Sequence, residues 1–220
     1  MSPLSDKAIV NRSSFTLIEL LIALGIIAIV STVLVITLNP AEIRREARDS
    51  VRLSQIGELN KAVNLFVVDN SSAYVGDDNK IYISIPGLSD CSDISSLPPP
   101  PPNWSYGCAA ETDYLKVDGT GWLPIDFTKI ASGVPFSRLP TDPVNDASQG
   151  LYYIYVKGGS WALTSLLESE KYLKQAALKD GGTDHARFEI GNDLALWTRA
   201  SGLVGYWKFD EGSGVVARDF

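Results

Sequence analysis

The sequence predicts an α+β fold, in which a long N-terminal helix with a membrane-spanning first half packs against a small antiparallel β-sheet. Three observations support this prediction. Residues 15–38 form a nearly unbroken apolar run, residues 39–70 carry apolar positions at helical spacing, and residues 71–202 change to short strand and turn patterns. We therefore expect a two-part helix at residues 15–70, a globular head at residues 71–202, and separate segments at residues 1–14 and 203–220.

The apolar run from Phe15 to Leu38 is long enough to cross a membrane. Eighteen of its 24 residues are apolar. A helix of this length extends about 36 Å, compared with about 30 Å for the hydrocarbon core of a bilayer. The flanking charges leave its orientation open, because Lys7 and Arg12 precede the run while four arginines follow it closely.

Glu19 is the one charged residue within this run. A carboxylate in a spanning segment costs up to about 3 kcal/mol at the helix centre, and less near an end. In one interpretation Glu19 lies hydrated near the membrane surface, where a first-turn acid suits the helix dipole. In the other, the residues before Phe15 are removed, and the new α-amino group supplies the positive charge that the run lacks.

The stretch SFTLIELLIALGIIAIVSTVL, Ser14 to Leu34, resembles the N-terminal signature of type IV prepilins and of type II secretion pseudopilins. The resemblance implies that residues 1–14 are a prepilin leader, and that a prepilin peptidase cleaves between Ser14 and Phe15 and N-methylates Phe15. It also implies that Glu19, the fifth residue after cleavage, helps to dock an incoming subunit. Ser14 departs from the family pattern, which has glycine before the cleavage site.

The resemblance implies a structural subunit of a type IV pilus or a type II secretion pseudopilus, and not an enzyme. The implied partners are the prepilin peptidase, other pilin or pseudopilin subunits, and an inner-membrane assembly platform. The implied location is the inner membrane, with the N-terminus in the cytoplasm, and then an extracellular or periplasmic filament. Residues 71–220 carry 19 acidic and 12 basic residues, which argues against nucleic acid as the main partner.

Residues 39–70 are predicted to form the amphipathic second half of the helix. Asn39-Pro40 indicates either a new helix start or a kink in a continuous helix. We expect one apolar stripe to lie under the head: Ile43, Ala47, Val51, Ile56, Leu59, Val63 and Phe66. A neighbouring stripe consists of arginines: Arg44, Arg48 and Arg52. Acids three and four residues away from them predict a solvated helix face with ion pairs within the helix. The alternative is a contact with another subunit or with lipid head groups.

The head is predicted to contain short strands. Ile81–Ile85 and Tyr114–Val117 have strand patterns, and Leu151–Val156 and Trp161–Leu167 have the pattern of a β-hairpin joined by Gly158-Gly159. His185, the one histidine of the sequence, has no catalytic motif around it, and we expect it to be an exposed structural residue.

Cys91 and Cys108 flank a run of five prolines and predict a disulfide that closes an exposed loop. The alternative is a pair of free thiols. Because major pseudopilins often hold calcium in a C-terminal loop, the family resemblance also suggests a calcium site at Asp142, Asn145 and Asp146, or at Asp180, Asp184 and Asp193, whose oxygen atoms suit this ion. Ordinary turn formation by these residues is the alternative.

The C-terminal stretch LVGYWKFDEGSGVVARDF, Leu203 to Phe220, resembles the opening strand of a laminin-G-type, concanavalin-like lectin domain. It implies one strand of an incomplete β-sandwich. The alternative function is therefore a minor, tip or membrane-anchored pilin-like adhesin, whose glycan-binding lectin domain is missing from this sequence.

Overall fold

The computed structural model describes the backbone of residues 15–70 and 74–202, and the side chains of these residues except 33–38. The predicted leader at residues 1–14 and the lectin-like segment at residues 203–220 lie outside this described part. The chain divides into two compact units, Met1–Ile43 and Arg44–Phe220.

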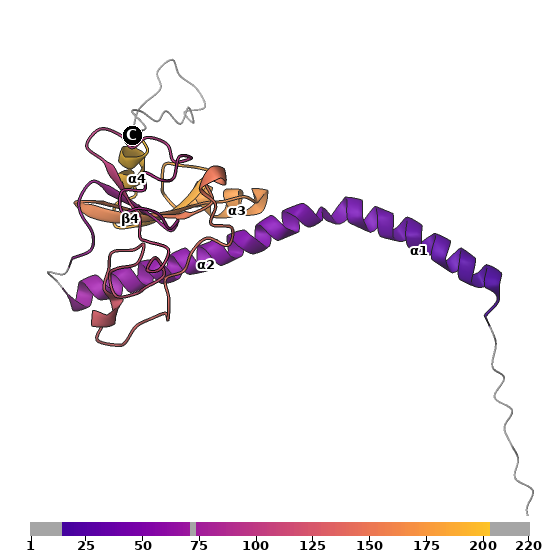
Figure 1. Ribbon diagram of the computed structural model, residues 1–220. Coiled ribbons are helices and arrows are strands. Elements are labelled where there is room, and N and C mark those ends of the chain that lie inside the picture. The colour runs from indigo at the N-terminus through magenta and orange to yellow at the C-terminus, as the bar shows by residue number, and fades with distance from the viewer. Residues whose placement is uncertain (1–14, 71–73, 203–220) are drawn as a thin grey trace, which may run out of the picture. The chain divides into compact units, whose positions relative to one another are not determined.

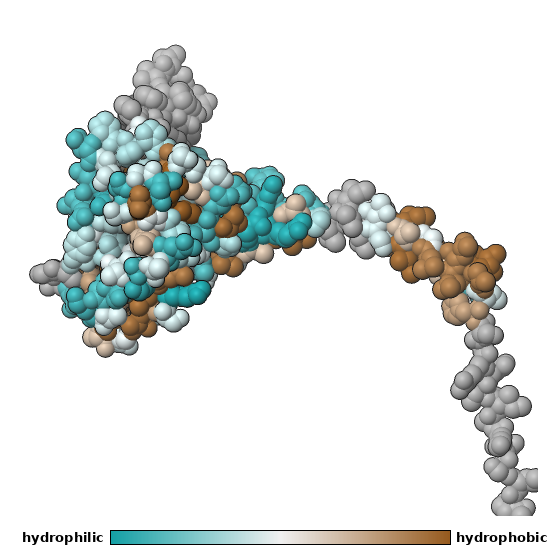
Figure 2. All heavy atoms as spheres, in the orientation of Figure 1, coloured by the Kyte–Doolittle hydropathy of each residue, from teal (hydrophilic) through white to brown (hydrophobic). Residues whose placement is uncertain are grey.

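The first unit contains helix α1, Leu17–Leu38 (Figure 1). Large apolar side chains among residues 17–30 of this helix are exposed, for example Leu17 at 83% and Ile18 at 67%, and Figure 2 shows hydrophobic side chains on the visible face of α1. An exposed apolar surface of this kind marks a segment that is covered by a membrane or by another protein. In the part of the chain that the structure describes, no helix is long and apolar enough to span a membrane.

Helix α2, Pro40–Asp69, begins directly after Asn39. Asn39 has a φ of 41°, in the left-handed region that asparagine tolerates, and this residue separates α1 from α2. The Glu42 N–H donates to Oδ1 of Asn39 at 3.4 Å, and Pro40 occupies the first helical position, where a missing N–H costs nothing. Of the two alternatives for Asn39-Pro40, the new helix start is therefore confirmed.

The head is built on a five-stranded sheet in the order β2-β1-β3-β4-β5. Its strands are β1 Lys80–Ile83, β2 Ser105–Gly107, β3 Tyr153–Gly158, β4 Ser160–Leu166 and β5 Arg187–Gly191. The pairs β1–β3, β3–β4 and β4–β5 are antiparallel, whereas β2 pairs with β1 in parallel. The α+β class is confirmed. The sheet is mixed and not wholly antiparallel, because a long loop carries the chain back before β2 begins.

Short helices complete the head. The α-helices are α3 Glu170–Gln175 and α4 Ala195–Ala200, and the 3-10 helices are η1 Phe127–Lys129, η2 Ala147–Gln149 and η3 Ala177–Lys179. The sequence patterns predicted none of them, nor β2 and β5.

The predicted hairpin is confirmed as β3 and β4, and Gly159 at its tip has a φ of 75°, which a glycine adopts without strain. The predicted strand at Ile81–Ile85 is confirmed as β1. The strand predicted at Tyr114–Val117 is wrong, because Tyr114 and Leu115 lie in a turn, Lys116 has no regular structure and Val117 lies in a bend. The carbonyl of Tyr114 instead accepts the Trp122 N–H at 2.9 Å, so its backbone bonds within a loop and not to the sheet.

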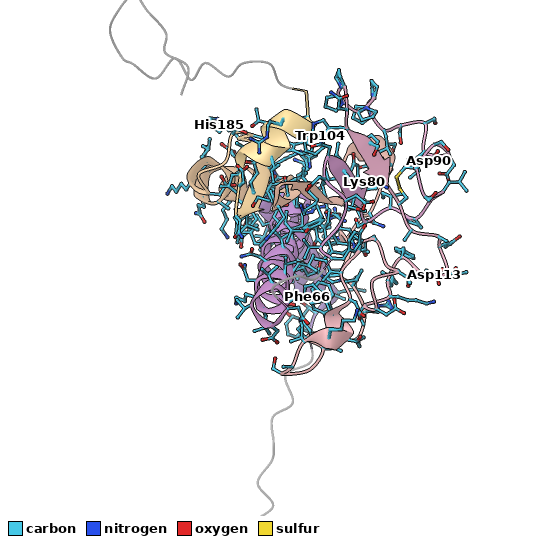
Figure 3. The ribbon with its side chains drawn as sticks, turned by 90° about the vertical axis from the view of Figure 1, so that its left-hand side faces the viewer. Phe66, Lys80, Asp90, Trp104, Asp113 and His185 are labelled. Carbon is cyan, nitrogen blue, oxygen red and sulfur yellow. A yellow bond between two sulfur atoms is a disulfide. The ribbon has the colours of Figure 1, made fainter. Side chains whose placement is uncertain are left out.

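Two apolar cores lie on opposite faces of the sheet. On one face, residues of α2 pack with loop and sheet side chains, including Ile56, Leu59, Phe66, Trp122 and Tyr155. On the other face, isoleucines of β1 and β3 pack with Leu196 and Ala200 of α4. Figures 1 and 3 show α2 against the sheet, with Phe66 within the first core.

The apolar stripe predicted along α2 is buried only in its second part. Ile56, Leu59, Val63 and Phe66 are buried as expected, whereas Ala47 is exposed and Ile43 and Val51 are 52% and 43% exposed. Each four-residue step advances about 40° around an α-helix, so a stripe begun at Ile43 rotates away from the buried face. Asp49 and Arg52 occupy that face instead.

Candidate assembly site

The N-terminal end of α1 forms a capping box between Thr16 and Glu19. The Thr16 N–H donates to Oε2 of Glu19 at 2.9 Å, and the Thr16 hydroxyl donates to the same oxygen at 2.7 Å. In return, the Glu19 N–H donates to the hydroxyl oxygen of Thr16 at 3.3 Å. This arrangement satisfies backbone donors that the first turn of a helix otherwise leaves open.

The capping box gives Glu19 local partners that the sequence interpretation missed. Glu19 is a first-turn acid, as one of the two interpretations expected, and its carboxylate is bonded even though the run contains no cation. The signal was present in the sequence, because Thr-x-x-Glu before an apolar run is the capping-box pattern. Pairing with an α-amino group at Phe15 stays a prediction.

The surroundings of Glu19 determine what this end of the helix can do. Phe15, Leu17 and Ile18 are 79%, 83% and 67% exposed, so the carboxylate sits among uncovered apolar side chains. When another apolar surface covers such a site, water is displaced and the effective dielectric constant falls. The attraction between two opposite charges then becomes stronger. A cation carried by a second molecule would then stabilise the contact more than apolar packing alone.

A second group of charges, here called the arginine network, joins α2 to the head. It consists of Arg48, Asp49, Arg52, Asp142 and Glu168. Arg52 is fully buried and forms a two-point contact with Asp142, at 2.6 Å from Nε and 2.9 Å from Nη2. Its Nη1 donates to Asp49 at 2.7 Å and to Glu168 at 2.5 Å.

The arginine network is closed at both ends by further hydrogen bonds. Arg48 contacts Glu168 at two points, at 2.7 Å and 2.6 Å. The carboxylate of Asp49 accepts the N–H groups of Glu168 and Ser169 and the Ser169 hydroxyl, directly before α3. Buried charges persist only when they are paired and hydrogen-bonded, and the buried Arg52, Asp49 and Asp142 meet that condition here.

The network shifts the pKa values of its members. The Arg48 guanidinium, with help from Arg52, lowers the pKa of Glu168 to about 2 although partial burial opposes this change. Burial alone would lower the pKa of Arg52, but the contacts with Asp142 and its neighbours outweigh burial and raise it. Both residues therefore stay charged at neutral pH.

The arginine network corrects the prediction for the arginine stripe. Arg52 was expected on a solvated face that is paired within the helix, yet two of its three partners come from the head. Asp49, three residues away, is the partner that the helical spacing did indicate. The partners Asp142 and Glu168 are distant in sequence, and no local pattern indicates them.

The residues of the first candidate calcium set, Asp142, Asn145 and Asp146, are engaged in other contacts. Asp142 forms an ion pair with Arg52. The Asn145 side chain accepts the Ser84 hydroxyl at 2.7 Å and donates to the Ser84 carbonyl at 3.1 Å. Asp146 caps η2 by accepting the Ser148 N–H at 2.8 Å. Within the described residues, no group of three His, Cys, Asp or Glu side chains could hold a metal ion. The contacts favour structural roles for all three residues.

Cys91 and Cys108 form a disulfide, drawn in Figure 3 near Asp90. Four of the five prolines between these cysteines are exposed, so the disulfide closes a surface loop as the sequence indicated. Ser14, on one side of the predicted cleavage point, lies outside the described residues, whereas Phe15 is the first residue that the structure describes.

Comparison with known proteins supports the N-terminal interpretation. A family model described as the prokaryotic N-terminal methylation motif matches residues 10–35, which include the predicted cleavage point and the Thr16–Glu19 capping box. No curated protein and no solved structure matches the chain. The lectin resemblance of residues 203–220 therefore stays a prediction. The resemblance to pilin-like proteins is confirmed for the N-terminal segment, which carries a prepilin-type methylation signal.

Proposed function

We propose that this chain is a structural subunit of a type IV pilus or a type II secretion pseudopilus. A prepilin peptidase cleaves before Phe15 and methylates it, and the subunit then polymerises through α1. The observation that carries the proposal is the methylation motif matched at residues 10–35. In the structure this stretch contains the first turn of α1, where Glu19 lies among exposed apolar side chains.

In this proposal, residues 15–38 rest in the inner membrane with the N-terminus in the cytoplasm, and then move into a filament. The apolar side chains leave lipid and pack against the same helix of neighbouring subunits. Because both surroundings are apolar, this transfer changes the hydrophobic free energy little. Glu19 gains a partner in that exchange, because the α-amino group of a neighbouring Phe15 is a cation. The capping box holds the carboxylate at the helix end where that amine would arrive.

The arginine network has a mechanical role in the proposed filament. Force on a subunit passes between the helix and the head, and Arg52 connects α2 to Asp142 and Glu168 of the head by buried charge contacts. Such contacts fix the helix in one rotational position, because a slipped helix would leave carboxylates buried without a partner.

Processing is tested by mass spectrometry of the protein isolated from cells that contain a prepilin peptidase. We expect an N-methylated Phe15 at the new N-terminus. The variant Ser14→Gly restores the family residue and should be processed at least as completely. An intact Met1 in both proteins would overturn the proposal and leave an unprocessed chain.

Assembly is tested with Glu19→Gln, which keeps the shape of the side chain but removes its charge. We expect processing and membrane recovery to be unchanged and incorporation into filaments to fall strongly. Glu58→Gln, an exposed acid of α2, is the matched control and should assemble normally. Equal incorporation of both variants would contradict the proposed charge pairing.

A further inference from the structure

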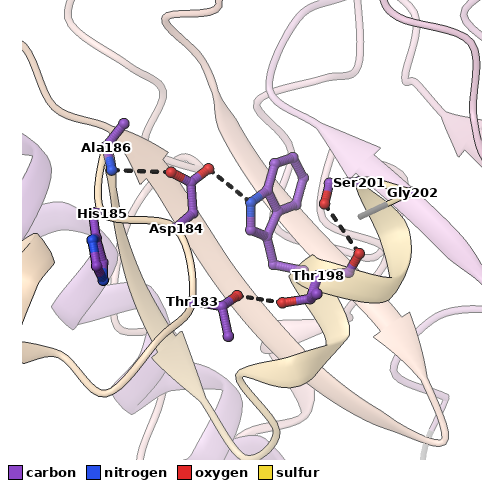
Figure 4. A pocket seen from close by; sticks show the side chains of 8 residues that line it. Thr183, Asp184, His185, Ala186, Thr198, Ser201 and Gly202 are labelled. Carbon is purple, nitrogen blue, oxygen red and sulfur yellow. Dashed lines mark hydrogen bonds between the residues drawn. The ribbon is translucent and has the colours of Figure 1, made fainter. Parts of the chain in front are cut away.

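A recess of about 540 Å³ lies in the head, between the loop before β5 and helix α4 (Figure 4). The loop contributes Thr183, Asp184, His185 and Ala186 to its lining, and the α4 region contributes Trp197, Thr198, Ser201 and Gly202. The volume falls in the range of small-ligand sites, roughly 300–1,000 Å³. Neither the capping box nor the arginine network uses any of these side chains.

Trp197 gives the recess a fixed aromatic surface. Its indole N–H donates to Oδ2 of Asp184 at 3.1 Å, and the Arg187 guanidinium lies 4.6 Å from the ring centroid. Both contacts hold the ring in place, so a ligand that stacks on it does not have to immobilise it. The ring is only partly buried, so part of its apolar surface borders the recess.

Besides the imidazole of His185, the polar side chains of the recess are the Asp184 carboxylate, which only accepts hydrogen bonds, and three hydroxyls, which can both donate and accept. The Asp184 carboxylate accepts the Ala186 N–H at 3.0 Å and the indole N–H, and a carboxylate has about four lone-pair positions, so acceptor capacity remains. The Thr183 and Thr198 hydroxyls bond to each other, and the Ser201 hydroxyl donates to the Thr198 carbonyl at 3.1 Å. A matching ligand therefore brings several O–H donors.

The charges of the recess favour a neutral ligand. Among the described residues that line it, none is Lys or Arg, which disfavours phosphates and carboxylates. The negative charge of Asp184 is offset by Arg187, whose Nε lies 3.6 Å away, so the recess does not favour an ammonium group either. We propose that this recess binds a neutral pyranose sugar, with one apolar sugar face on Trp197 and ring hydroxyls donating to the Asp184 carboxylate.

This binding site does not depend on assembly, and it is tested on the full chain in detergent micelles. Saturation-transfer NMR with glucose, galactose and N-acetylglucosamine measures binding directly, and choline serves as the cationic probe. We expect transfer to at least one sugar, with a dissociation constant in the millimolar range, and no transfer to choline. No transfer to any sugar, or transfer to choline alone, would overturn the proposal.

A pair of variants at Ser201 locates the site. Ser201 is exposed at the end of α4, so Ser201→Phe fills the recess without removing a core contact, whereas Ser201→Ala leaves it open. We expect saturation transfer to be lost in the first variant and retained in the second. Trp197→Ala should also lose it, with Trp104→Ala as the control for loss of an indole elsewhere. Undiminished transfer in Ser201→Phe would place the sugar outside this recess and overturn the assignment.

Discussion

Glu19 in α1 and Arg52 in α2 are both ionisable side chains with apolar neighbours, but they hold their charges in different ways. Glu19 is exposed, and its hydrogen-bond partners among the described residues belong to the neutral Thr16. Arg52 is fully buried and contacts three carboxylates, that of Asp49 one helical turn away and those of Asp142 and Glu168 in the head. The charge of Glu19 can therefore pair with a cation on another molecule. The charge of Arg52 instead holds parts of the same molecule together.

The largest expected effect comes from Arg52→Ala. Removing one partner of a buried ion pair leaves uncompensated charge, and such changes cost about 3–5 kcal/mol. Thermal unfolding of the head should therefore begin at a clearly lower temperature, by about 2–4 °C for each kcal/mol in a domain of this size. Arg45→Ala, at an exposed position of the same helix, is the control and should change stability by less than about 1 kcal/mol.

A double variant makes this comparison sharper. Arg52→Met combined with Asp142→Leu replaces a buried charge pair by apolar groups, which in other proteins is often neutral or stabilising. We expect it to recover part of the stability that Arg52→Ala loses. If the double variant is as unstable as Arg52→Ala, the remaining contacts of Arg52 with Asp49 and Glu168 matter more than the contact with Asp142.

The pKa of Glu168 predicts how the stability of the head depends on pH. Because its folded pKa is lowered from 4.5 to about 2, its contribution is present above pH 4.5 and is lost as the pH falls toward 2. Glu168→Gln should therefore lower the free energy of unfolding at pH 7 by at most about 3 kcal/mol and have little effect near pH 2. Urea unfolding at both pH values measures this change. A loss of equal size at pH 2 and pH 7 would show that packing, and not charge, is responsible.

Glu189 of β5 is expected to show the opposite pH dependence. It is 1% exposed, its Oε1 has no hydrogen-bond partner among the described residues, and burial raises its pKa to about 7. A raised folded pKa means that stability is present below pH 4.5 and is lost as the pH rises toward 7. Glu189→Gln cannot ionise, so it should stabilise the head at pH 8 by about 1–2 kcal/mol and change little at pH 4. Destabilisation at pH 8 would show that the ionised carboxylate has a partner there.

The two regions also differ in how far the sequence predicts them. The apolar run, the new helix start at Asn39-Pro40 and the hairpin depend on local patterns, and the structure confirms their elements. The capping box is equally local, because Thr16 and Glu19 are three residues apart, and the Thr-x-x-Glu pattern alone was sufficient to predict it. The arginine network could not be predicted in the same way. Its members Arg52, Asp142 and Glu168 come together only in the folded head.

The same distinction explains the errors in the head. The stripe along α2 was extended to Ile43 and Val51 because apolar residues were assumed to mark the buried face, whereas Arg52 is buried there with its charge paired. The strand predicted at Tyr114–Val117 has strand-type residues but no neighbouring strand to bond with. Strand formation depends on cross-strand partners more than on residue preference, so a short pattern alone was insufficient.

The smallest expected effect tests the local side of the comparison. Thr16→Val keeps the branched shape of the side chain and removes its hydroxyl, and loss of a helix N-cap costs about 1 kcal/mol. In micelles, amide hydrogen exchange in the first turn of α1 should then speed up about fivefold, since 1.4 kcal/mol corresponds to tenfold. Thr16→Ser keeps the hydroxyl and should exchange like the original chain. Because the capping box involves no residue of the head, neither variant should change the unfolding temperature of the head. Faster exchange in both variants would show that the methyl group of Thr16, and not its hydrogen bond with Glu19, orders this end of the helix.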